Sequence, residues 1–356
     1  MYFKYKKLKI LFLTYTKIHT DKPTFYKQMN KFVDEKIIAK GAYGSVYSTI
    51  DTERGEKVIL KKVKISKNIK KNKREYFIPK MLSHLNLIKC HEAYYNKSNI
   101  IYVFEHYSDC TLRDYMKNEL SKYGLLKIEE KEIIVKNIMK QLKDALLCLY
   151  DNNIIHRDIK PENILMKDDK LKLIDFGMSN FFKKENIQPG YKKEGQKFAG
   201  ISDSFFPGHL VKEDGTITNI NPWAGTIAYM APELLNKMPY NIKSDLWSCG
   251  ILLYEMLYNK RPYPDRMSST SSGAQLATLT NIEYEYNYSD ECMDLMKSLL
   301  MVDVKDRCDW EYFRNHKWFC DKNKILDQDI LVNEDIQKIE VKKEEQNNVN
   351  NMCIVS

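Results

Sequence analysis

The sequence lacks the marks of several protein classes. Its 356 residues include eight cysteines, but none form a Cys-x-x-Cys pair and no Cys/His cluster has zinc-ligand spacing. Neither a zinc site nor a disulfide framework is therefore indicated. No apolar run approaches the roughly 18 residues of a membrane-spanning helix, and no repeat unit recurs. Isolated cysteines of this kind are typical of reduced thiols in a cytoplasmic protein.

The composition is that of a folded protein with a sizeable core. Hydrophobic residues make up 43% of the chain and aromatic residues 12%, which excludes collagen-like and wholly disordered chains. The formal net charge of +9 suits an anionic partner such as a nucleotide, an acidic lipid or a nucleic acid. Because no nucleic-acid recognition module accompanies this charge, we expect no nucleic-acid binding.

The pattern of apolar residues changes along the chain. Residues 32–65 alternate apolar and polar positions between glycines, which predicts consecutive antiparallel strands. From about residue 111 the apolar residues recur at helical spacing. The sequence therefore predicts an α+β protein, with a small β-rich lobe over 32–107 and a larger α-helical lobe over 108–319.

Three segments are predicted to lie outside the packed core. Residues 1–31 form a basic extension whose apolar stretch is too short for a signal peptide. Residues 183–222 contain five glycines and mixed charge, and residues 320–356 are charged and rich in asparagine. Since neither of these two has a periodic apolar face, we expect the first to be a mobile insert and the second a tail.

Three motifs follow one another in the second half of the chain. His156-Arg157-Asp158-Ile159-Lys160-Pro161-Glu162-Asn163 comes first, Asp175-Phe176-Gly177 begins twelve residues after Asn163, and a Gly-Thr-x-x-Tyr-x-Ala-Pro-Glu segment occupies 225–233. Any one of them could arise by chance. In this order and at these spacings, they make residues 32–319 resemble the eukaryotic protein kinase family, of the Ser/Thr type.

The resemblance implies the bilobal protein kinase fold and transfer of the γ-phosphate of ATP to protein Ser/Thr hydroxyls, with Mg²⁺. Such a transfer needs the phosphate held in line, its charge neutralised and the acceptor hydroxyl oriented. Asp158 would accept the proton of that hydroxyl, and Asn163 and Asp175 would supply oxygen ligands to Mg²⁺. Lys160 would reach the γ-phosphate and also Thr226.

The same resemblance implies a nucleotide site built mainly in the first lobe. Lys61 would bind the α- and β-phosphates and pair with Glu75, while Phe104 would form the wall behind the adenine. The remaining residues would supply the glycine-rich loop and the backbone groups that contact the base: Ala39, Gly41, Gly44, Val46, Glu105 and Tyr107. Ala39 stands where the family has its first glycine, so we expect a working but stiffer loop.

Glu75 is the one acid between Glu56 and Glu92, but Pro79 follows it four residues later. Inside one helix the proline ring would clash with the carbonyl group of residue 75. We therefore expect this helix to be kinked, displaced or late in starting. Together with Ala39, this feature supports a rival interpretation, a kinase-fold scaffold with little or no catalytic activity.

Other matches concern support and specificity. By resemblance, Asp245 braces the catalytic loop and Arg307 pairs with Glu233. Glu162 and Glu255 match acids with which some kinases recognise an upstream arginine, and Arg157 would pair with an activating phosphate. The segment after Asp175 and the helix containing Trp247 resemble those of the calcium/calmodulin-dependent-type group of kinases.

The chain ends Cys353-Ile354-Val355-Ser356, which fits a C-a-a-X prenylation box, and the terminal serine favours farnesyl. A single lipid chain gives marginal, reversible binding unless a second signal is added. We therefore expect a protein shared between cytoplasm and membranes, with Ser/Thr-containing protein substrates. The oligomeric state stays open.

Overall fold

The computed structural model describes residues 29–41, 44–64, 69–95, 98–123, 127–184, 209–217, 225–263 and 282–320. The described residues divide between two units, with the boundary between Arg314 and Asn315. Several predictions fall outside the described residues: Cys353, nearly all of the basic extension and of the tail, and most of the 183–222 insert. Within the described ranges, no helix combines the length and the apolar character needed to cross a membrane.

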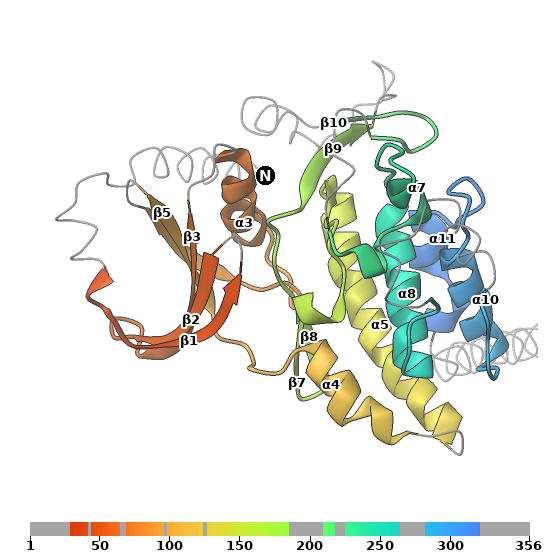
Figure 1. Ribbon diagram of the computed structural model, residues 1–356, viewed down its shortest axis with the longest axis horizontal. Coiled ribbons are helices and arrows are strands. Elements are labelled where there is room, and N and C mark those ends of the chain that lie inside the picture. The colour runs from red at the N-terminus through yellow and green to blue at the C-terminus, as the bar shows by residue number, and fades with distance from the viewer. Residues whose placement is uncertain are drawn as a thin grey trace, which may run out of the picture. The chain divides into compact units, whose positions relative to one another are not determined.

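The first lobe is built on a five-stranded antiparallel sheet (Figure 1). Its strands lie in the order β1-β2-β3-β5-β4, and they are β1 (Phe32–Gly41), β2 (Gly44–Asp51), β3 (Glu56–Lys64), β4 (Cys90–Tyr95) and β5 (Asn99–Glu105). Phe32, Val58, Leu60 and Val103 belong to the buried cluster that stabilises this sheet. The alternation predicted from the sequence is the reason that these side chains share one face.

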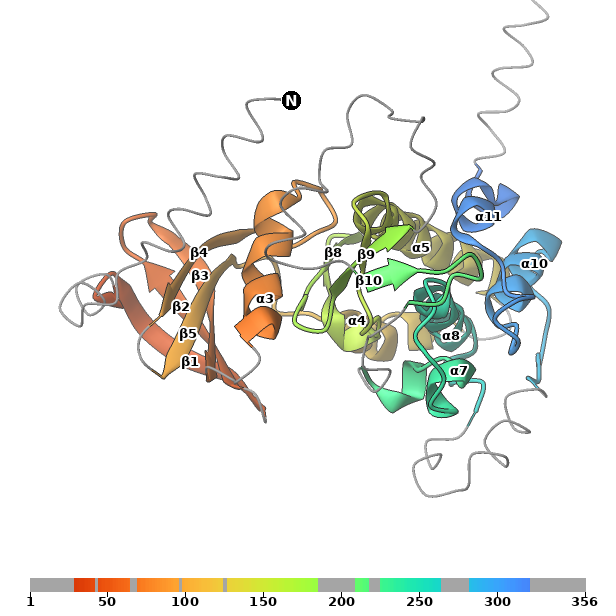
Figure 2. The same ribbon diagram turned by 90° about the horizontal axis from the view of Figure 1, so that it is seen from above.

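The helix α3 (Ile69–Met81) contacts strands β4 and β5 (Figure 2). The expected kink or late start is wrong, because the helix includes both Glu75 and Pro79 without a break. Pro79 removes one N–H group in the last turn, and Leu82 N still donates to Ile78 O at 3.0 Å. Ile78 is fully buried, so packing against the sheet stabilises the helix despite the proline.

The second lobe is mainly helical. The long helix α5 (Ile128–Asp151) buries one face, whereas all residues of α8 (Ser244–Tyr258) are buried. The two helices lie side by side (Figure 1). Its other described helical segments are α4 (Leu112–Asn118), η1 (Leu120–Lys122), η3 (Pro161–Asn163), η4 (Ile227–Tyr229), α7 (Pro232–Leu235), α10 (Asp290–Leu299) and α11 (Trp310–Asn315). The second unit contains the short helix η6 (Lys317–Phe319).

Short strands position the catalytic motifs. The hairpin of β7 (Ile164–Lys167) and β8 (Lys170–Leu173) begins directly after Asn163 and ends two residues before Asp175. At its open end Ile174 N donates to Asn163 O at 2.9 Å. The hairpin therefore brings the two residues expected to bind Mg²⁺ to one end of the same ladder.

Part of the segment expected to be an unpacked insert is folded. Strand β10 (His209–Val211) pairs in parallel with β9 (Asn180–Lys184), which in turn pairs with β6 (Ile154–Ile155). Val211 and Ile217 are buried. The expectation is wrong for residues 209–217, because a few apolar residues suffice there to pack a short strand and a turn. Residues 185–208 and 218–222 lie outside the described ranges.

Candidate active site

The buried carboxylate of Asp245 fixes the start of the expected catalytic loop, residues 156–163. Asp245 accepts hydrogen bonds from His156 N at 2.8 Å, Arg157 N at 2.9 Å and the Tyr240 hydroxyl at 2.7 Å. This is the bracing contact that the resemblance implies. Arg157 has φ 72°, a left-handed conformation that is costly for a side-chain-bearing residue. The two bonds from consecutive amides to one carboxylate hold the backbone in that conformation.

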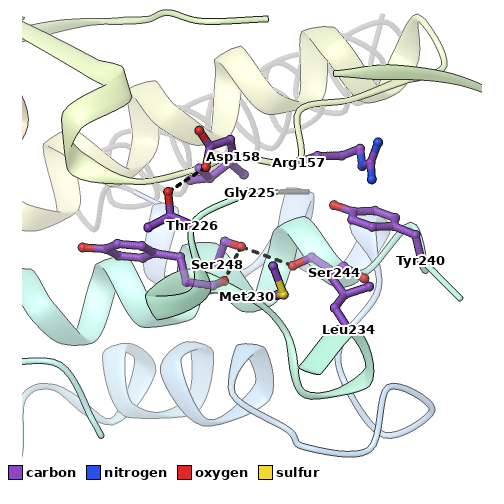
Figure 3. Close-up of a pocket in the computed structure, with 11 residues that line it drawn as sticks. Arg157, Asp158, Gly225, Thr226, Met230, Leu234, Tyr240, Ser244 and Ser248 are labelled. Atoms are coloured by element: carbon purple, nitrogen blue, oxygen red, sulfur yellow. Dashed lines mark hydrogen bonds between the residues drawn. The ribbon is translucent and has the colours of Figure 1, made fainter. Parts of the chain in front are cut away.

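Asp158 stands at the centre of a tight group of polar side chains. Its Oδ2 atom accepts from Lys160 Nζ and Asn163 Nδ2, both at 2.9 Å, and its Oδ1 atom accepts from the Thr226 hydroxyl at 3.0 Å. Lys160 Nζ also donates to Thr226 Oγ1 at 2.7 Å, which is the contact expected from the sequence. Figure 3 shows Asp158 and Thr226 facing each other. The carboxylate is thereby held in one orientation.

Gly225 allows the segment that carries Thr226 to approach the backbone of Arg157 closely. Its φ is +110°, and a Cβ atom here would lie 2.6 Å from Arg157 O. Any other residue would therefore be both strained and in steric conflict with the catalytic loop. This glycine brings Thr226 within reach of Asp158.

The candidate cation ligands are Asn163 and Asp175. Asn163 uses its amide nitrogen twice, toward Asp158 O at 2.8 Å and toward Asp158 Oδ2 at 2.9 Å. Its amide oxygen is then the atom with which it would bind a cation, beside a carboxylate oxygen of Asp175. Amide, carboxylate and phosphate oxygens are the ligands that Mg²⁺ prefers, so these residues fit that ion.

Lys61 joins the sheet, α3 and the segment after β8. Its Nζ atom lies 2.8 Å from Glu75 Oε1 and 3.0 Å from Asp175 Oδ1. Burial opposes the charge on Lys61, but the carboxylates of Glu75 and Asp175 raise its pKa well above the ordinary value. Burial favours the neutral form of Asp175, but Lys61 lowers its pKa well below the ordinary range. Burial raises the pKa of Glu75 to about 7 despite the neighbouring lysine. Lys61 thus remains a cation.

The residues of the expected glycine-rich loop lie at the β1–β2 turn. Ala39 pairs with Val46 and Gly41 pairs with Gly44 across the two strands, and residues 42–43 lie outside the described ranges. A Cβ atom on Gly44 would overlap the carbonyl oxygen of Lys62 on β3. Close strand packing therefore requires this glycine, independently of any phosphate.

The expected adenine-contacting residues lie at the end of β5. Phe104 is buried within the sheet. Glu105 N donates to Lys89 O at 3.1 Å, so the carbonyl group is the one that Glu105 would offer to a base. The side chain of Glu105 pairs with Lys172 Nζ at 2.8 Å, and the same ammonium lies 5.3 Å from the centre of the Tyr107 ring. These contacts fix the segment that links the two lobes.

Two arginines belong to this region although the sequence did not single them out for it. Arg113 contacts Glu162 and Glu255, and Arg74 donates to Ser179 O at 2.9 Å. Burial and the nearby charge of Arg157 lower the pKa of Arg74 to about 10. Neighbouring cations of this kind are stabilised by a bound anion. No local pattern could reveal these partners, which lie far away along the chain.

Comparison with known proteins agrees with the fold. The family model of the protein kinase domain matches residues 32–319. Serine/threonine-protein kinase atg1 of Dictyostelium discoideum is 30% identical over 308 residues, which cover 82% of this chain and 40% of that protein. Calcium-dependent protein kinase 5 of Plasmodium falciparum is 26% identical over 321 residues, which cover 87% of this chain and 48% of that protein.

A probable myosin light chain kinase of Dictyostelium discoideum is 31% identical, with coverage of 79% of this chain and 52% of that protein. The chain thus spans about half the length of these relatives. The family and the two-part α+β fold predicted from the sequence are confirmed. Since the family model covers most of the chain and the motifs and fold agree with it, the protein belongs to the protein kinase family.

Proposed function

We propose that the protein is a serine/threonine protein kinase that transfers the γ-phosphate of ATP to Ser or Thr hydroxyls of other proteins. The observation that carries this proposal is the arrangement around Asp158, whose carboxylate is held by Lys160, Asn163 and Thr226. One relative is named as a serine/threonine-protein kinase, and another is named as a calcium-dependent protein kinase. In the family that the chain resembles, a lysine at the position of Lys160 and a threonine at that of Thr226 are features of the Ser/Thr kinases.

The side chains divide the work of phosphoryl transfer. Lys61, kept charged by Glu75 and Asp175, would bind the phosphates and neutralise part of their charge. Asp158 would accept the hydrogen bond of the acceptor hydroxyl and then its proton, while Lys160 would stabilise charge on the transferred group. Asn163 and Asp175 would hold Mg²⁺, which neutralises phosphate charge when bound.

The rival interpretation, a scaffold with little activity, loses one of its two supports. Pro79 was expected to displace the helix that carries Glu75, but Lys61 and Glu75 are 2.8 Å apart. Ala39 remains, in a strand position paired with Val46. The side chains of Lys160, Asn163 and Thr226 all contact the Asp158 carboxylate, which favours the catalytic proposal.

The direct test is transfer of labelled γ-phosphate to a generic protein substrate by the purified chain. We expect label on serine and threonine, no label on tyrosine, and loss of transfer when a chelator removes Mg²⁺. The chelator should act because both proposed ligands are hard oxygen donors. Label on tyrosine alone, or no transfer with Mg²⁺ and ATP in excess, would refute the proposal.

We also propose that Cys353 is farnesylated and that the protein divides between cytoplasm and membranes. The support is the C-terminal sequence Cys-Ile-Val-Ser. A Cys353→Ser variant is expected to move the membrane-bound share into the soluble fraction, because the lipid supplies most of the binding free energy. Fractionation and mass spectrometry of the native C-terminus measure this. An unmodified cysteine followed by Ile-Val-Ser contradicts the proposal.

A further inference from the structure

A cavity of about 400 Å³ opens beside the proposed phosphotransfer site. Lys160 and Thr226, two of the side chains that hold Asp158, form part of its wall. A polypeptide whose Ser or Thr hydroxyl reaches Asp158 must therefore place neighbouring side chains at this cavity. The other charged residues of its lining are Arg113, Glu162 and Arg261.

Two carboxylates converge on this place from different parts of the chain. Glu162 comes from η3, and its side chain is 46% exposed. Glu255 comes from α8, and its side chain is 8% exposed. Without a cation, the buried carboxylate of Glu255 would be costly, and the pair would attract a basic side chain of a substrate.

Arg113 of α4 already supplies a cation to both carboxylates. Its Nε atom lies 2.8 Å from Glu162 Oε1, its Nη1 atom 2.7 Å from Glu255 Oε1, and its Nη2 atom 2.5 Å from the Tyr229 hydroxyl. All three guanidinium nitrogens are thus engaged. The Tyr229 hydroxyl also donates to Glu255 Oε2 at 2.5 Å, which completes a closed network.

We propose that Arg113 is a specificity-determining residue, which occupies the acidic subsite from within and so removes any preference for a basic side chain at this point of the substrate. The inference rests on the proposed protein kinase function. It departs from the expectation that Glu162 and Glu255 would recognise an arginine upstream of the acceptor.

Two physical arguments support the proposal. A substrate arginine would have to displace the guanidinium group of Arg113 from Glu162 and Glu255. Because Arg113 belongs to the same chain, its effective concentration at these carboxylates is high. The entropy lost in ordering its side chain has also been met during folding, whereas a substrate side chain would still lose that entropy on binding. The charge balance also leaves no surplus negative charge for a further cation, because Arg113 and Arg261 offset Glu162 and Glu255 while Lys160 is paired with Asp158. Arg261 Nε lies 3.8 Å from Glu255 Oε1, so it adds a second cation to that carboxylate.

The test uses the full chain and a peptide set in which arginine or alanine stands at each position around a single acceptor serine. We expect the wild-type protein to show a ratio of kcat/KM values for arginine and alanine near one at every position. In Arg113→Ala, the ratio should rise on the order of tenfold at one position, since the freed carboxylates then gain a charged partner. Lys117→Ala removes an exposed cation from the same helix and should leave all ratios unchanged.

Glu162→Gln provides a second measurement, and its wild-type arm does not depend on the folding of the Arg113 variant. In the wild-type background it should not lower the arginine ratio, because the subsite is filled, whereas in Arg113→Ala it should abolish the gain. The proposal is overturned if the wild-type protein prefers arginine tenfold at one position and Glu162→Gln removes that preference, or if folded Arg113→Ala keeps all ratios near one. Absence of transfer to every peptide and to protein substrates would instead refute the kinase function itself.

Discussion

An Asp158→Asn variant is expected to lose phosphoryl transfer by about 10²–10⁴-fold, the usual contribution of a positioned general base. The amide keeps the size of the side chain but cannot take the proton of the acceptor hydroxyl. Lys160 Nζ and Asn163 Nδ2 both donate to the carboxylate of Asp158. The NH₂ group of an asparagine cannot accept these hydrogen bonds. Single-turnover transfer of labelled phosphate measures the loss.

The matched control is Asp290→Asn, which makes the same chemical change at an exposed position in the first turn of α10. It should keep the wild-type rate. Thermal unfolding should show that Asp158→Asn remains folded, since Asp245 and not Asp158 fixes the backbone of the loop. A folded Asp158→Asn protein with the wild-type rate would show that Asp158 is not the base.

An Arg307→Met variant is expected to lower the free energy of unfolding by about 3–5 kcal/mol, the usual cost of removing one partner of a buried ion pair. The Arg307 side chain is fully buried, and its two terminal nitrogens lie 2.9 Å from the two carboxylate oxygens of Glu233. Its Nε atom donates to Met301 O at 3.1 Å. The methionine would leave the Glu233 carboxylate, whose side chain is only 9% exposed, without this donor.

Urea unfolding of the two proteins measures the difference. Lys122→Met breaks an exposed ion pair with Glu119 and should cost less than about 1 kcal/mol, because water and salt screen such pairs. A double variant, Arg307→Met with Glu233→Met, should lose less than the sum of the single variants, since no isolated charge remains. An Arg307→Met protein as stable as the wild type would mean that the buried pair contributes no net stability.

The sequence predicted the proximity of Asp158, Lys160 and Asn163 well, because these residues are close together along the chain. Asp158, Lys160 and Asn163 fall within six residues, and backbone geometry alone keeps them near one another. The β7–β8 hairpin was equally predictable, and it places Asp175 next to Asn163. The family resemblance then supplied the distant contact between Lys160 and Thr226.

The errors arose where long-range packing decides the structure. The rule that proline breaks a helix failed at Pro79, because burial of Ile78 against the sheet stabilises the last turn of α3. Strand β10 could not be predicted, because its partner β9 lies more than twenty residues away and parallel pairing leaves no local pattern. Arg113 escaped notice for the same reason, since Glu162 and Glu255 are 49 and 142 residues distant.

The two neighbouring residues Arg74 and Glu75 of α3 have a joint thermodynamic consequence. Glu75 contacts Lys61 in the sheet, whereas Arg74 contacts Ser179 O in the segment after the Asp175 motif. Because one rigid helix carries both contacts, a rotation that breaks one breaks the other. The two equilibria are linked, so the nucleotide proposed to bind at Lys61 would also favour the ordered segment at Ser179 when it favours the Lys61–Glu75 pair. By reciprocity, a change that orders this segment would strengthen that proposed binding by the same factor.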